Sequence, residues 1–367
     1  MFKAFRKVKR NRGAAGIDKQ SITMFEANLE ENLMALMKDL KRRGAYNPLP
    51  LLRRYIPKSR TEQRPLGIPA VRDRVAQEVI RLLIERYFEP FFHNNSYGFR
   101  PKRNTKMAIE MIIELRRLGY RYVVDADIKG FFDNIPHQLI MNFIREKIAD
   151  GNILDIIEKF LTSGVMEDGL FRPTDKGTPQ GGIISPLLAN IVLDALDKEL
   201  ALNGYTFVRY ADDFIVLCKN AADCEKALAF VNDVIETKLG LKLSPEKTCI
   251  TSFRKGFDFL GFHFYYNGVT IREKSVEKFK DNIRKNTIRS RNFDDEVIMK
   301  LNRIIRGFAN YFAAEFSRVK WQFELLDAMI RRRLRCMKKK RISKLDNHRI
   351  TNKYFQKRGL VSLCSLI

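Results

Sequence analysis

The sequence predicts an α+β fold, in which a core of mixed strands and helices is followed by a helical C-terminal region. Residues 120–128 (YRYVVDADI) are aromatic and β-branched, which is typical of a buried strand. Two further strand-like runs, 205–210 and 214–218, are separated only by residues 211–213, as in a β-hairpin. After Arg272 almost every segment has a helical pattern. Strands interrupted by helices, followed by helices alone, indicate an α+β core with an all-α region.

The remaining elements are expected in the following order. The first segment is expected to be rich in loops, because it contains NRGAAGID (11–18) and the Pro- and Arg-rich stretch 46–69. The expected helices, taken along the chain, are 71–92, 105–118, 136–149, 152–162, 183–202, 221–238, 273–290, 293–316, 318–337 and 347–358. Short strands are expected at 241–243 and 248–253, and a second hairpin at 257–271.

Length and composition exclude several classes of protein. The 367 residues, of which 45% are hydrophobic, are enough for two or three packed units at roughly 150 residues each. No apolar run approaches the roughly 18 residues that cross a bilayer, and the basic N-terminus lacks the apolar stretch of a secretory signal. The five cysteines are an odd number without a CxxC pair, which argues against a disulfide framework and a zinc finger. A cytoplasmic protein that does not bind membranes is expected.

The positive charge is distributed unevenly. The formal net charge is +25, from 68 basic and 43 acidic residues. Residues 1–106 contain 24 basic and 10 acidic residues, residues 107–271 contain 18 and 23, and residues 272–367 contain 26 and 10. Basic flanks attract a polyanion such as nucleic acid. Carboxylates next to bound phosphate require a divalent metal to offset their charge.

Three carboxylates stand at strand ends, because Asp127 ends the buried strand while Asp212 and Asp213 occupy the hairpin turn. Aspartate in a turn is often structural, because its side chain hydrogen-bonds the local backbone. Three carboxylates without basic partners on the same face, however, repel one another unless a cation binds. Oxygen ligands suit Mg²⁺. Two such ions, ~3.5–4 Å apart, are the usual device for phosphoryl transfer.

The sequence resembles the reverse transcriptases encoded by bacterial group II introns. The two catalytic motifs of that family are similar to RYADD (209–213) and DIKGFFD (127–133). Further matches follow the family's order: GAAGID (13–18), IPKSRTEQRPLGIPAVRDRVAQ (56–77), SYGFRPKRNT (96–105), GTPQGGIISPLLANI (177–191), LKLSPEKT (241–248) and FLGF (259–262). The C-terminal segments LLDAMIRRRLRCMKKK (325–340) and ITNKYFQKRGLVSL (350–363) resemble parts of the family's thumb, or maturase region.

The resemblance implies a right-hand polymerase fold. It implies fingers at 1–106, an antiparallel-sheet palm at 107–271 with finger elements interleaved, and a helical thumb at 272–367. Asp127, Asp212 and Asp213 would be catalytic residues that bind two Mg²⁺ ions, with Mn²⁺ as a substitute. The thumb match is shorter than in typical intron proteins and no endonuclease segment follows it, so polymerisation is better supported than splicing assistance or DNA-targeted mobility.

Five residues are implied to bind the nucleotide. Lys58 and Arg64 would hold the triphosphate, whose charge needs cations beyond the metal. Phe132 would be a steric gate against a 2′-hydroxyl, although Phe131 and Phe132 could both be core residues. If the strand continues, its alternation places these two rings on opposite faces. Gln180 would contact the incoming nucleotide, and Lys247 would lie near the pyrophosphate as a proton donor unless it is a surface lysine.

The function implied is an RNA-directed DNA polymerase that extends a primer on an RNA template. Its partners would be template RNA, a DNA or RNA primer and dNTPs, with a cognate structured RNA as a further candidate. One alternative is a group II intron maturase that mainly binds RNA and assists splicing. Others are a domesticated reverse transcriptase in phage defence or DNA repair, and an RNA-dependent RNA polymerase, against which Phe132 argues. The sequence does not indicate an oligomeric state.

Overall fold

The computed structural model describes residues 1–57, 63–178 and 181–367. They form two compact units, Met1–Ile250 and Thr251–Ile367, and the boundary falls inside strand β8 (Cys249–Ser252). The α+β class expected from the sequence is confirmed, because antiparallel sheets and helices alternate in the first unit. The division into fingers, palm and thumb remains a prediction.

The first 70 residues contain more regular structure than expected. Helices α1 (Phe2–Arg10), α2 (Ile22–Ala27) and α3 (Leu29–Lys41) precede a hairpin of β1 (Leu51–Pro57) and β2 (Gln63–Ile68). The prediction of a loop-rich segment is therefore wrong. Helix α1 is stable although it is strongly basic, because it buries an apolar stripe and packs against α4 (Val71–Phe88). Strand β1 also pairs in parallel with β4 (Val165–Glu167), which pairs with β5 (Leu170–Arg172).

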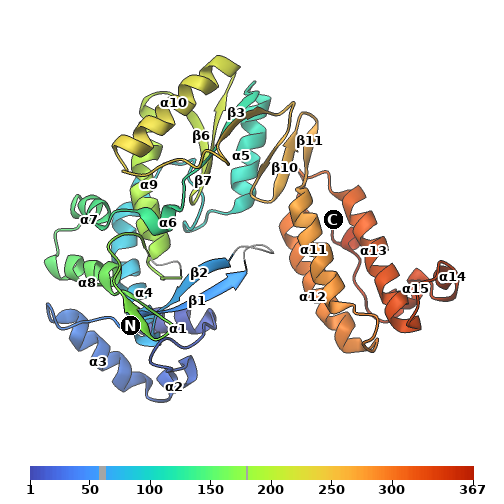
Figure 1. Ribbon diagram of the computed structural model, residues 1–367, viewed down its shortest axis with the longest axis horizontal. Coiled ribbons are helices and arrows are strands. Elements are labelled where there is room, and N and C mark those ends of the chain that lie inside the picture. The colour runs from blue at the N-terminus through green and yellow to red at the C-terminus, as the bar shows by residue number, and fades with distance from the viewer. Residues whose placement is uncertain (58–62, 179–180) are drawn as a thin grey trace. The chain divides into compact units, whose positions relative to one another are not determined.

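The second sheet of this unit carries the acidic residues. Its strand order is β6-β7-β3-β8, with β6 at Thr206–Tyr210, β7 at Asp213–Cys218 and β3 at Tyr122–Asp127. Helix α10 (Ala221–Thr237) packs against β3 and β7, and α9 (Ser185–Leu202) packs against β6 and α10 (Figure 1). Val124 and Ala126 enter the main core, so the alternating Asp125 and Asp127 lie on the opposite face.

The helices between residues 71 and 250 agree with the predicted ones to within a few residues, except that the short helix α6 was not predicted. They are α4 (Val71–Phe88), η1 (Glu89–Phe91), α5 (Thr105–Arg117), α6 (Phe131–Asn134), α7 (His137–Arg145), α8 (Gly151–Thr162), α9 (Ser185–Leu202) and α10 (Ala221–Thr237). The side chains of Asn104, Asp150 and Asn220 cap α5, α8 and α10 by accepting backbone N–H bonds. Residues 241–243 are not a strand, because Leu243 makes only an isolated bridge to Ile128.

The second unit begins with a small sheet of order β11-β10-β9, where a single hairpin was expected. Its strands are β9 (Phe257–Phe259), β10 (Phe262–Tyr265) and β11 (Gly268–Ile271). The helices that follow are α11 (Glu273–Asn286), α12 (Asp295–Phe312), α13 (Lys320–Lys339), α14 (Asp346–Arg349), α15 (Asn352–Lys357) and η2 (Leu363–Leu366). The helix expected at 347–358 is broken because Arg335 binds the Ile350 carbonyl and the Asn352 side chain at the break.

Within the described ranges, no helix has both the length and the apolar character required to span a bilayer.

Candidate active site

Asp212 lies in the two-residue turn that connects β6 and β7. Tyr210 on β6 pairs with Asp213 on β7, so Ala211 and Asp212 alone form the turn. Two-residue hairpin turns require a positive φ at their first position, and Ala211 has φ 59°. This conformation costs an alanine about 1 kcal/mol. Asp212 is therefore placed at the tip of a strained turn, while Asp213 starts the next strand.

The three aspartates meet at one end of the sheet. Asp127 is directly opposite Asp213 in the antiparallel register of β3 and β7, and such partners have Cβ atoms about 4.5–5.5 Å apart. Burial raises the pKa of Asp212 above its ordinary value, and the charge of Asp127 raises it further, whereas Arg64 and Lys247 lower it. Asp212 thus lies within the field of Asp127, and a cation would relieve their repulsion.

The segment 241–248 folds back onto the end of β3 and holds Asp127. The N–H of Ser244 donates to the Asp127 carbonyl at 2.7 Å, and the Lys129 N–H donates to the Lys242 carbonyl at 2.9 Å. The same segment brings the Lys247 Nζ to 2.7 Å from Asp127 Oδ2. The expectation that the carboxylates have no basic partner on their face is therefore wrong.

The residue types at this sheet end suit a divalent metal, because all three candidate ligands are carboxylates, the donors that Mg²⁺ prefers. Their present conformation is not that of a formed metal site. In the ranges that the structure describes, no three His, Cys, Asp or Glu side chains are grouped so that they could hold an ion. Asp127 is 29% exposed and is engaged by Lys247, so metal binding would require this ion pair to open.

Comparison with known proteins decides the family. The family model described as reverse transcriptase (RNA-dependent DNA polymerase) matches residues 56–264, more than half of the chain. The chain belongs to the reverse transcriptase family. The model for the group II intron maturase-specific domain matches residues 276–355. The resemblance to group II intron reverse transcriptases is therefore confirmed.

Relatives of this reverse transcriptase support the same assignment. It is 36% identical over 284 residues to protein YkfC of Escherichia coli K12, covering 67% of this chain and 74% of YkfC. It is 32% identical over 344 residues to the group II intron-encoded protein LtrA of Lactococcus lactis, covering 76% of this chain but only 56% of LtrA. A structure of telomerase from Candida albicans with a telomeric RNA fragment is similar, with a TM-score of 0.50 and 12% sequence identity. The match covers 87% of this chain and 64% of the telomerase chain. That similarity shows only the fold, which is the right-hand polymerase fold.

The residues predicted to contact the nucleotide are only partly described. Lys58 and Gln180 lie outside the described residues. Arg64 is an exposed residue of β2 that pairs with Ile56, and its charge acts on Asp212. Arg64 therefore belongs to the surroundings of the acidic group in this reverse transcriptase.

Phe132 lies in the short helix α6 and not in a continued strand, so the premise used to separate it from Phe131 is wrong. Phe131 is buried at 2% exposure, whereas Phe132 is half-buried and packs against the same core, with its ring centroid 5.5 Å from that of Phe131. The role of Phe132 as a steric gate therefore stays a prediction. The chain turns after β3 because Gly130 takes the left-handed conformation at φ 54°. The Thr178 N–H donates to the Phe132 carbonyl at 2.7 Å, so the glycine-rich segment is attached to α6.

The buried partners of Arg209 behind the turn were not predicted from the sequence. Arg209 is fully buried and paired with Asp197, and Asn190 is a second partner. Asn190 and Asp197 are seven residues apart, both buried on one face of helix α9. Two buried polar residues at that spacing were the signal, because a buried charge requires a partner.

Proposed function

We propose that this reverse transcriptase extends a DNA or RNA primer on an RNA template, using dNTPs. The observation that carries the proposal is the meeting of Asp127, Asp212 and Asp213 at one end of the sheet. When bound there, two Mg²⁺ ions would activate the primer 3′-oxygen and stabilise the leaving pyrophosphate. The role of the protein is to hold the three carboxylates in position. In this proposal residues 1–106 are fingers, 107–271 palm and 272–367 thumb.

We assign the binding and selection of the nucleotide to five further side chains. Arg64 and Lys58 neutralise the triphosphate, and Gln180 contacts the nucleotide. Phe132 is half-buried next to the helix start, and its ring fills the space that a 2′-hydroxyl would need. Lys247 now pairs with Asp127; with Asp127 engaged as a metal ligand, Lys247 would be available near the pyrophosphate as a proton donor. We place this activity in the cytoplasm, in keeping with five free cysteines.

Primer extension by the purified full-length chain tests the proposal. Asp212→Ala should abolish dNTP incorporation on an RNA template while the protein remains folded and binds the template. Asp155→Ala is the matched control, because among the described residues the ion pair of Asp155 is with Lys159, one turn along helix α8, and such pairs contribute about 0.5 kcal/mol or less. If Asp212→Ala extends primers at the wild-type rate, the assignment is wrong.

The match of residues 276–355 to the maturase-specific domain favours a second candidate function, assistance in intron splicing. This function would depend on RNA binding and not on the carboxylates. A maturase would still promote splicing of a group II intron transcript when it carries Asp212→Ala. Loss of primer extension with retained splicing assistance would separate the two functions.

A further inference from the structure

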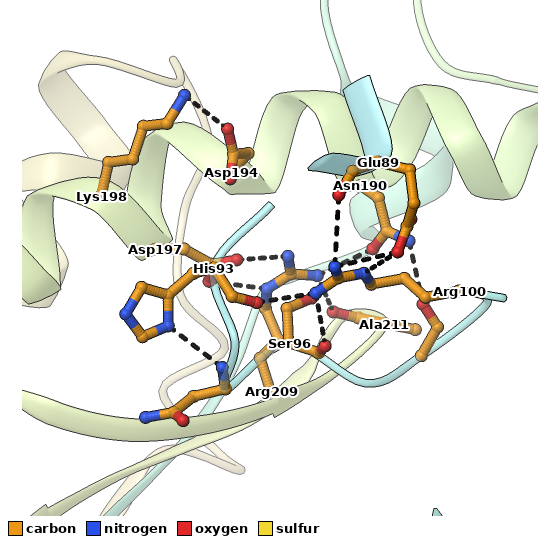
Figure 2. Close-up of polar contacts among 12 residues, drawn as sticks. Glu89, His93, Ser96, Arg100, Asn190, Asp194, Asp197, Lys198, Arg209 and Ala211 are labelled. Carbon is orange, nitrogen blue, oxygen red and sulfur yellow. Dashed lines mark hydrogen bonds and ion pairs between the residues drawn. The ribbon is translucent and has the colours of Figure 1, made fainter. Parts of the chain in front are cut away.

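A fully buried arginine lies directly behind the turn that carries Asp212. The Arg209 side chain is 0% exposed, as is that of its ion-pair partner Asp197. Arg209 Nε donates to Asp197 Oδ1 at 2.7 Å, and Nη2 donates to Oδ2. The remaining nitrogen, Nη1, donates to Asn190 Oδ1 at 2.9 Å and to the Ala211 carbonyl at 3.0 Å (Figure 2). One guanidinium thus connects helix α9 to the backbone of the turn.

The same network holds a second segment against β6. The Arg209 N–H donates to the Asn95 carbonyl, and the Tyr97 N–H donates to the Arg209 carbonyl, both at 2.9 Å. The Asn190 side-chain amide donates to the Gly98 carbonyl at 2.9 Å. Asn190 therefore bonds both the arginine and the backbone that lies against the turn.

This arrangement is not explained by stability alone. Burying two charges is costly, and replacing a buried ion pair with apolar residues is often neutral or stabilising. What an apolar pair could not supply is the donor to the Ala211 carbonyl. Ala211 has a left-handed conformation that an alanine rarely adopts, and the bond from Arg209 opposes its relaxation.

We propose that Arg209, anchored by Asp197 and Asn190, is a positioning residue that keeps Ala211 left-handed and thereby fixes Asp212 relative to Asp127. This inference rests on the proposed function of these carboxylates as metal ligands. Arg209 touches neither metal nor substrate, so its effect passes entirely through the turn. Lysine cannot replace it, because a lysine has no planar fork to bond Asp197, Asn190 and the carbonyl together.

The principal test is Arg209→Lys in the full-length chain, compared with the wild type and with Asp212→Ala. We expect the kcat of primer extension to fall at least tenfold, with the Kd for primer–template within twofold of the wild type. The affinity for Mn²⁺, measured by calorimetry without nucleic acid, should fall at least fivefold. The double variant Arg209→Lys/Ala211→Gly should have a kcat about fivefold higher than that of Arg209→Lys alone, since glycine removes about 1 kcal/mol of backbone strain.

A matched control separates position from stability. Arg81 is a nearly buried arginine whose partners, Glu78 and Glu85, lie on its own helix α4. Arg81→Lys should lower the melting temperature as Arg209→Lys does, but leave kcat and Mn²⁺ affinity unchanged. If Arg81→Lys lowers kcat equally, or if Ala211→Gly restores nothing, the positioning role is refuted.

Two further outcomes keep the test decisive. If Arg209→Lys does not fold, Asn190→Ala leaves the ion pair intact and should still weaken Mn²⁺ binding at least twofold; unchanged binding would overturn the proposal. If the wild type shows no primer extension, the proposed function fails, whereas the Mn²⁺ measurement still tests the effect of Arg209 on the turn.

Discussion

Gly98 lies against the backbone of the turn, and its replacement by alanine tests how accurately the turn must be placed. A Cβ at residue 98 would lie 2.2 Å from the Ala211 nitrogen and 2.8 Å from the Tyr210 carbonyl carbon. Ordinary contact begins at 3.4 Å, so the two backbones must separate by about 1.2 Å, the difference between 3.4 and 2.2. Both neighbours are backbone atoms, so no flexible side chain can absorb this shift.

The shift would change the position of Asp212 relative to Asp127, because Asp212 follows Ala211 directly. A misplacement of about 1 Å in a catalytic group can cost about 100-fold in rate, which corresponds to about 2.7 kcal/mol of transition-state stabilisation. We therefore expect Gly98→Ala to lower the kcat of primer extension about 100-fold. Primer–template affinity should stay close to that of the wild type, since basic side chains elsewhere provide most of it.

Gly151→Ala is the matched control for the same chemical change. Neither glycine has a left-handed φ, and a Cβ at residue 151 would be 3.6 Å from the Arg43 guanidinium, an ordinary contact. Its kcat should equal that of the wild type. A folded Gly98→Ala protein with wild-type kcat would show that the turn tolerates displacement, and the reasoning would then be refuted.

Three other predictions follow from the described residues. Phe132→Ala should raise the incorporation of ribonucleotides relative to dNTPs in a competition assay; an unchanged ratio would exclude the gate. The logarithm of the association constant for template should fall linearly with the logarithm of the salt concentration, because neutralisation of phosphates dominates binding. An association constant that does not change with salt would contradict the charge argument. Burial alone would raise the pKa of Glu78, but Arg81 and Lys7 outweigh burial and lower it below the ordinary 4.5. Ionised Glu78 therefore stabilises the fold above about pH 4.5, and this contribution is lost as the pH falls through the lowered pKa. Glu78→Gln should accordingly lower the melting temperature at pH 7 and lose this effect near pH 3; an equal effect at both pH values would disprove the linkage.

Local patterns predicted the elements that carry the carboxylates. Alternation over 120–128 identified a buried strand, and β3 does end at Asp127. The short spacing between the runs 205–210 and 214–218 identified the hairpin, although Asp213 belongs to the strand and only two residues form the turn. Periodicity and turn composition depend on only a few neighbouring residues, so they can be recognised in the sequence without knowledge of the fold.

Pairings between distant segments could not be predicted in this way. The bond from Lys247 to Asp127 joins residues 120 positions apart, and nothing in either local sequence specifies it. Strands β1 and β2 were not predicted, because a segment rich in proline and arginine has the composition of a loop. The strands are stabilised by pairing with each other and, for β1, with β4. The buried partners of Arg209 depend on the packing of α9 against β6, which only the fold determines.

The three carboxylates are held in the site by different parts of the backbone, and a final prediction follows from this difference. Asp127 and Asp213 are fixed by the hydrogen-bonded register of two neighbouring strands, so a change elsewhere moves them only if the sheet itself is disrupted. Asp212 has no strand of its own and depends on the strained turn at Ala211. Substitutions behind the turn, at Arg209 or Gly98, should therefore weaken metal binding through Asp212 while hydrogen exchange of β3 and β7 amides remains protected. Exchange that rises throughout the sheet in these variants would indicate general unfolding and would contradict a selective effect on Asp212.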